Sequence, residues 1–178
     1  MGLIHKTKFV PFIDVSSTTT PSWVQIKKST TFSLAFNPQT KTFDFISSEN
    51  PEEEIDSYQP ALSQSLTMFD DEPDFQTVFE MAYHLPTGGD AHKDVLLVFY
   101  AKKHVTEDTT PVTYYAAWKV NSVVKLGTLD RVAQSIDFDL ALNKRTEGAV
   151  TVTTNESGDK VPTFVAGTWV GDVFTPAA

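Results

Sequence analysis

Polar and apolar residues alternate through Ser135-Ile136-Asp137-Phe138-Asp139-Leu140, and the alternation continues through Ala141 and Leu142. Successive side chains of a β-strand point to opposite faces of the sheet, so this stretch predicts a strand. Its apolar face, which carries Ile136, Phe138 and Leu140, belongs to a hydrophobic core. Asp137 and Asp139 share the opposite face, which either meets bulk solvent or lines an aqueous channel.

The same period of two recurs on both sides of this strand and predicts about eight strands in all. The candidate strands are residues 31–36, 42–46, 61–69, 95–101, 112–120, 132–142, 149–154 and 164–174. Asn37-Pro38-Gln39-Thr40 is typical of a turn, so the first two strands are expected to pair as a hairpin. Residues 95–101 are apolar on both faces, which predicts a central strand that is covered on one side by the helix or by another subunit.

One amphipathic helix is predicted among the strands. Phe75, Val78, Phe79 and Ala82 are spaced to lie on a single helical stripe. Pro73 suits the first turn of a helix, and Gly88-Gly89 favours its end. The expected fold class is therefore mainly β: a β-sandwich or half-barrel with one packed α-helix.

The first 22 residues differ in character from the rest of the chain. An apolar piece that contains Phe9, Val10, Phe12 and Ile13 precedes the polar run 16–22. This pattern predicts an N-terminal arm and linker over residues 1–22, followed by a β-domain over residues 23–178. The four apolar side chains are expected to dock on another subunit.

Composition excludes several classes of protein. The 178 residues suffice for one well-buried core, and the absence of cysteine excludes disulfides, thiolate metal sites and thiol nucleophiles. A net charge of −9 argues against a protein that grips nucleic acid through its phosphates. We find no apolar run long enough for a signal peptide or a membrane span, and we expect folding in a cytoplasm.

No motif for catalysis or for a cofactor is present. The loop from Gly89 to Asp94 contains two carboxylates and His92, but it is better explained as a polar connection than as a metal site. Residues 47–59 form a predicted acidic loop that contains Glu52, Glu53 and Glu54. Its carboxylates lack the spacing of an EF-hand calcium loop, so a solvated or partner-facing charge run is favoured. We expect no enzyme, no cofactor and no metal.

Several stretches together resemble the major tail protein, or tail tube protein, of long non-contractile phage tails. They are Phe43-Asp44-Phe45-Ile46 followed by Asn50-Pro51, then Tyr58-Gln59-Pro60 leading into Leu62-Ser63-Gln64-Ser65-Leu66, and finally residues 130–140. The resemblance spans about residues 23–154 and consists of composition and order, not of a short diagnostic motif. The segment after Asn155 has no counterpart that we can align.

The resemblance implies a structural subunit that forms hexameric rings, with inner strands joining into a continuous barrel around a lumen. Asp137 and Asp139 would then face the lumen, and Glu52, Glu53 and Glu54 would belong to an inter-subunit loop. The implied partners are other copies of the chain, the tape measure protein, and the tail terminator and distal tail proteins. Double-stranded DNA would pass without specific binding, and the protein would reside in the virion tail after assembly in the bacterial cytoplasm.

An alternative is a monomeric β-sandwich binding module of the carbohydrate or adhesin type. Such a module would present aromatic side chains, here Trp23, Trp118 or Trp169, as a platform for sugar rings. The position of Trp118 in a mostly apolar alternating run favours a core residue instead.

Overall fold

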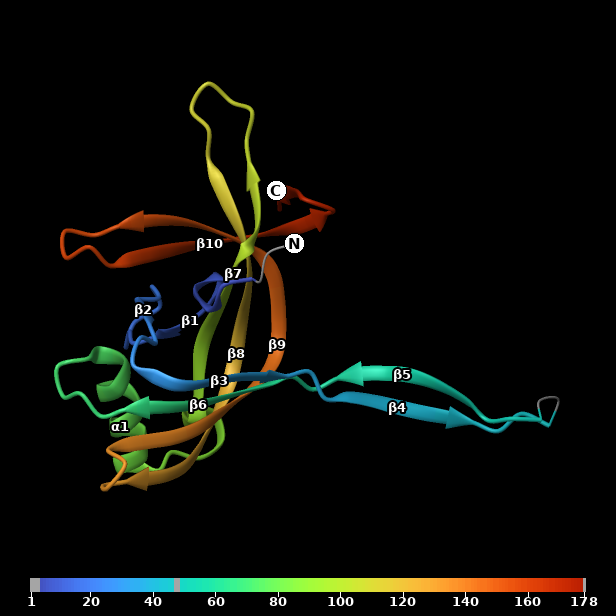
Figure 1. The fold of residues 1–178 in the computed structure, drawn as a ribbon, viewed down its shortest axis with the longest axis horizontal. Helices are drawn as coiled ribbons and strands as arrows, with labels where there is room; N and C mark the ends of the chain where they lie inside the picture. Colours follow the sequence, from blue (N-terminus) through green and yellow to red (C-terminus); the bar gives the residue numbers. More distant parts are fainter. Residues whose placement is uncertain (1–3, 47–48, 178) are drawn as a thin grey trace.

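The computed structural model describes residues 4–46 and 49–177, and these form eleven strands and one α-helix (Figure 1). The strands are β1 (Phe9–Asp14), β2 (Trp23–Gln25), β3 (Ser29–Ala35), β4 (Pro38–Phe43), β5 (Glu52–Tyr58), β6 (Ala61–Thr67), β7 (His92–Val105), β8 (Thr113–Asp130), β9 (Ser135–Thr154), β10 (Lys160–Val170) and β11 (Val173–Pro176). The helix α1 spans Pro73–His84, and two short 3-10 helices span Lys6–Lys8 and Gly88–Ala91.

Nine strands form one antiparallel sheet that branches at β9. One path runs β11-β10-β9-β8-β7-β1-β2, while β6 pairs with the first half of β9 and β3 pairs with β6. Because the two halves of β9 have different neighbours, the sheet curls into a half-barrel (Figure 1). The predicted fold class, mainly β with a curled sheet and one helix, is confirmed.

The helix covers the concave apolar side of the curled sheet. Phe75, Val78 and Met81 of α1 pack into the larger core cluster with Leu66 and Ile136. Pro73 opens the helix as predicted, and Leu85 ends it in the left-handed conformation. The predicted stripe is only partly correct, since the Phe79 side chain is exposed and Met81 takes its place in the core.

A smaller core cluster lies on the other face of β7. It contains Phe12, Leu96, Val98, Ala117 and Val150, all of which are almost fully buried. Val95 and Leu97 of the same strand belong to the larger cluster. The strand is therefore apolar on both faces, as predicted, and both faces are covered by residues of the same chain.

Within the predicted arm, residues 9–14 form a strand of the chain's own sheet. Strand β1 pairs with β7 through Phe9–Ile13 and with β2 through Phe12–Asp14. Phe12 and Ile13 have no exposed surface, whereas Phe9 and Val10 are half-buried. The polar run folds back over Asp14, whose side chain accepts hydrogen bonds from the backbone N–H groups of Ser16 and Ser22.

The predicted hairpin of residues 31–36 and 42–46 is wrong. Strand β3 pairs with β6, and β4 pairs with β5 to form a two-stranded sheet of its own. Residues 52–58, predicted as loop, are therefore strand. Asn37 lies between β3 and β4 at a φ of 43°, and its side-chain amide donates to the carbonyl of Gln59, which lies between β5 and β6. The β4–β5 hairpin thus continues the β3–β6 ladder away from the body (Figure 1).

The two late strands predicted at 132–142 and 149–154 are one strand, β9, which begins at Ser135. Val132 lies in the preceding turn with an exposed side chain. The intervening residues 143–147 are polar, because here β9 crosses from one core cluster to the other with its side chains in solvent.

Candidate functional site: a polar sheet face with two free edges

Four antiparallel strands in the order β3-β6-β9-β8 form the lower part of the curled sheet, which we call the ribbon. One face of the ribbon is polar in every strand. Ser33, Ser63, Asp139 and Lys125 stand in one cross-strand row, and Thr31, Ser65 and Asp137 stand in the next. The two sequence-predicted carboxylates thus belong to a continuous surface of small polar side chains.

The opposite face of the ribbon is its core side. Leu34, Leu62, Leu140 and Val124 form one row there, and α1 packs against it. Gln64 is the exception on this side, because its side chain is buried between Phe32 and Phe138. Neither atom of its amide group has a hydrogen-bond partner among the described residues.

Asp137 and Asp139 differ in how firmly the fold holds them. The Ser65 hydroxyl donates a hydrogen bond of 2.6 Å to Oδ1 of Asp137, which is half-buried. Asp139 is exposed. Both residues line a shallow hollow of about 320 Å³ together with Thr31, Ser63 and Ser65. The polar face is therefore hollowed, and it carries two carboxylates that the alternation in β9 places on the same side.

Both long edges of the ribbon are open. β3 pairs only with β6, and in the described part of the chain its outer edge has no strand beside it. β7 pairs with β8 no further than Val123, so residues 124–130 of β8 likewise have β9 as their sole strand neighbour in the same part of the chain. An open edge presents unpaired N–H and C=O groups that can pair with another chain.

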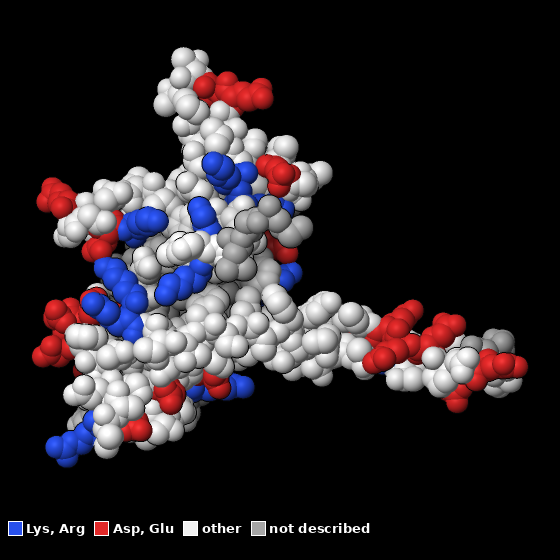
Figure 2. All heavy atoms as spheres, in the orientation of Figure 1, with Lys and Arg blue, Asp and Glu red and all other residues white. Residues whose placement is uncertain are grey.

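The β4–β5 hairpin is the most exposed and most acidic element. All described residues in its two strands are exposed. Residues 38–58 contain six carboxylates, Asp44, Glu49, Glu52, Glu53, Glu54 and Asp56, against a single lysine, Lys41. Lys41 forms an ion pair of 2.5 Å with Asp56. Figure 2 shows the carboxylates along the outer part of the hairpin, while the lysines and arginines gather mainly on the body.

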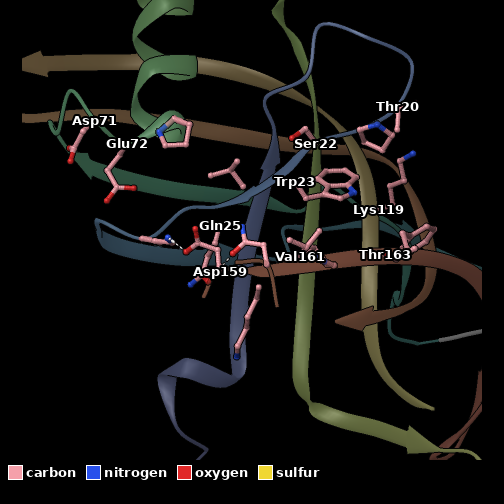
Figure 3. A pocket seen from close by; sticks show the side chains of 18 residues that line it. Thr20, Ser22, Trp23, Gln25, Asp71, Glu72, Lys119, Asp159, Val161 and Thr163 are labelled. Atoms are coloured by element: carbon pink, nitrogen blue, oxygen red, sulfur yellow. Dashed lines mark hydrogen bonds and ion pairs between the residues drawn. The ribbon is translucent and has the colours of Figure 1, made fainter. Parts of the chain in front are cut away.

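A hollow of about 880 Å³ lies between β2, β10 and the start of α1. Figure 3 shows Trp23 from β2 on the same side as Val161 and Thr163 from β10, with Asp71 and Glu72 at the far end. Lys27 and Asp159 form an ion pair of 2.5 Å at its border, and this hydrogen bond is the main reason why the pKa of Lys27 is raised. Its three lysines face three carboxylates, so the hollow has no net charge to attract an ion.

Residues 89–94, predicted as a polar loop, form the end of a 3-10 helix and the start of β7, where His92 and Asp94 make structural hydrogen bonds. Asn121 contacts the His92 ring at 2.7 Å and donates to Asp94 at 2.8 Å. No group of three metal-ligating side chains occurs within residues 4–46 and 49–177. In the same ranges, no helix has the length and apolar character needed to cross a membrane.

Comparisons with known proteins give distant structural similarity alone. No family model matches the chain, and no curated protein is similar to it. A chain in the cryo-electron microscopy structure of the anti-feeding prophage baseplate, 6-fold symmetrised, is 11% identical with a TM-score of 0.42; the match covers 83% of this chain and 95% of that chain. A type six secretion system protein is 9% identical with a TM-score of 0.33, over 89% and 95% of the two chains.

Proposed function

We propose that the protein is a structural subunit of a phage tail tube, which self-assembles into stacked rings around a channel. The observation that carries this proposal is the ribbon, whose two faces differ in polarity and whose two edges are open. The helix α1 covers the apolar face. The other face is polar, so it can remain in contact with water. The edges of the ribbon are left for pairing with other copies.

The open edges are on opposite sides of the ribbon, which favours a closed ring. If the β3 edge of one copy pairs with the 124–130 edge of β8 in the next, every copy uses two different surfaces. Such a heterologous contact repeats around a ring until the barrel closes, and closure removes both exposed edges of the ribbon. Six copies per ring is the number that the sequence resemblance implies.

The polar face would then line the lumen. Small serine and threonine side chains leave space in a channel, and Asp137 and Asp139 together outweigh the positive charge of Lys125 on the same face. Negative charge repels DNA phosphates, so double-stranded DNA would pass without being held. The tape measure, tail terminator and distal tail proteins are the further partners proposed for such a tube, with the virion tail as its location.

The exposed hairpin is proposed to contact a neighbouring copy through its acidic part, including Glu52, Glu53 and Glu54. A two-stranded hairpin is marginally stable in water by itself. Contact with a second copy would therefore also stabilise the hairpin.

Electron microscopy of the purified protein tests the proposal. We expect rings or tubes at high concentration and after prolonged incubation. Proline substitutions at the neighbouring residues Phe32 and Ser33 sharpen the test, because successive N–H groups of a strand point in opposite directions. One of the two variants keeps its hydrogen bond to β6, and that variant should fold but form no rings. A protein that stays strictly monomeric, or rings that survive in the folded variant, would contradict the proposal.

The alternative of a sugar-binding module has less support. The Lys102 ammonium lies over the Trp169 ring at 5.0 Å, and the Arg145 guanidinium lies over the Trp118 ring at 4.5 Å. Trp169 also packs against Phe174. Trp23 is half-buried against the smaller core cluster. The three tryptophans therefore do not present one exposed aromatic platform, which is what a sugar ring would need.

A further inference from the structure

An aromatic pocket of about 350 Å³ opens where β7, β8 and β10 meet. Phe9, Phe99, Trp118 and Trp169 form its walls, and Phe99 packs edge-on against Trp118 with 4.8 Å between ring centroids. The four aromatic side chains are half-buried. The exposed residue Ala101 also lines the pocket and leaves room for a further side chain.

Cationic groups surround this aromatic pocket. Lys102 lines it and lies over Trp169, and Arg145 lies over Trp118. Glu147 is the single carboxylate among the lining residues, and Arg145 pairs with it at 2.9 Å. The pocket is therefore suited to an aromatic side chain that is flanked by negative charge.

The outer part of the hairpin has these two properties. Phe43 and Phe45 are stacked with an interplanar angle of 5°, and 38% and 49% of their respective surfaces are exposed. Asp44 lies between them in sequence, and Glu52 pairs with Phe43 across the hairpin. Eight residues of extended chain from Pro38 to Phe45 reach about 26 Å. Because the hairpin points away from the body, these side chains are placed to meet another molecule (Figure 1).

We propose that Phe43 and Phe45 of one copy insert into the aromatic pocket of a second copy, with the hairpin carboxylates beside Lys102. The contact is distinct from the pairing of ribbon edges, and it rests on the proposed function in requiring a second copy of the chain. It uses different surfaces of the two copies, so each molecule can both give a hairpin and receive one. Such a contact propagates along an assembly instead of ending at a dimer.

Cross-linking of single-cysteine variants tests the contact, since the natural chain has no cysteine. One variant carries Ile46→Cys, next to Phe45 and fully exposed, and the other carries Ala101→Cys at the pocket. The two, distinguished by mass, are mixed and treated with a short bis-maleimide. We expect mixed dimers. The control partner carries Val132→Cys in the turn before β9. Val132 is similarly accessible but remote in sequence from every pocket-lining residue, so this variant should give few mixed dimers.

A second pair of variants tests whether Phe43 and Phe45 hold the contact. Phe43→Ser with Phe45→Ser, added to the Ile46→Cys chain, should weaken the contact at least about tenfold, since aromatic anchors dominate binding. Tyr58→Ser, which removes an exposed aromatic ring at the base of the same hairpin, should leave the yield unchanged. Circular dichroism checks that both variants fold. Equal yields with Ala101→Cys and Val132→Cys, or a yield that survives loss of both phenylalanines, would overturn the contact.

Electron microscopy of the same samples separates this contact from the proposed function. Rings without mixed dimers would overturn the hairpin contact and leave the ring proposal intact. Mixed dimers without rings or tubes would support the hairpin contact and overturn the ring proposal.

Discussion

Tyr100 is a buried tyrosine whose hydroxyl has no hydrogen-bond partner among the described residues. Burial, with a smaller contribution from the neighbouring Tyr115, raises its pKa to about 12. An unsatisfied buried hydroxyl costs stability, so Tyr100→Phe should raise the free energy of unfolding by about 1 kcal/mol. Urea denaturation at neutral pH measures the difference, and a variant that is clearly less stable would show that the hydroxyl has a partner.

The same substitution has a pH dependence of known sign. Between pH 10 and pH 12, unfolding lets Tyr100 ionise, because its pKa in the unfolded chain is near the ordinary 10. The unfolded state then holds fewer protons than the folded state. The contribution of Tyr100 to the free energy of unfolding therefore falls as the pH rises. We therefore expect the stability advantage of Tyr100→Phe to grow above pH 10, measured by urea denaturation across that range. An advantage that shrinks would contradict the raised pKa.

Gly148 lies where β8, β9 and β10 pack most closely. A Cβ at this position would lie 2.7 Å from the Phe164 ring and would also collide with the Val165 carbonyl oxygen. Gly148→Ala should therefore lower the free energy of unfolding by about 1–3 kcal/mol, the usual cost of overpacking. The matched control is Gly89→Ala, which has open space around it and should change stability by less than about 0.5 kcal/mol. Thermal unfolding of both variants distinguishes crowding from a general loss of glycine.

At the scale of elements, sequence periodicity predicted the features that depend on neighbouring residues: the type of element and which of its faces is apolar. The helix, the doubly buried strand and the alternation in residues 135–142 all follow from which side chains are apolar, and each was found. Pairing was not predictable in the same way. Nothing near Phe32 indicates that β3 pairs with β6, more than thirty positions away, because the partner depends on the bend at Asn37 and not on a local turn. Gln64 is two residues from both Leu62 and Leu66, so the alternation of its strand places its polar side chain on the apolar face, as the structure shows.

The N-terminal segment shows the same limit and gives a prediction at this scale. An apolar piece followed by a polar run is compatible with an arm. It is equally compatible with a strand followed by a loop that leads back to the next strand. Since β1 lies between β2 and β7, deletion of residues 1–20 should unfold the smaller core around Phe12. Deletion of residues 1–5 alone should be tolerated, because the described residues Ile4 and His5 are exposed. Thermal unfolding decides, and a stable product of the longer deletion would restore the interpretation as an arm.

At the scale of the whole molecule, charge is divided between a hairpin rich in carboxylates and a ribbon whose polar face carries Asp137 and Asp139. In an assembled tube the second group repeats in every copy. Exposed charges are screened over about 10 Å at 0.1 M salt, so the effect of one substitution in one subunit is small. Repetition along the lumen makes it large, because DNA meets the altered surface at each ring.

Asp137→Lys together with Asp139→Lys should slow DNA passage, most clearly at low salt, if the polar face lines the channel. Asp139 is exposed and its substitution should leave folding unchanged, whereas Asp137→Lys loses the hydrogen bond from Ser65 and should cost about 1 kcal/mol. Glu107→Lys with Asp108→Lys makes the same change in net charge in the exposed loop between β7 and β8 and serves as the control. DNA release from otherwise identical particles measures passage. A control that slows release equally would assign the effect to net charge. The alternation in β9 forces both carboxylates to the same side, so an assembled structure that places them on the outer wall would exclude both from the lumen.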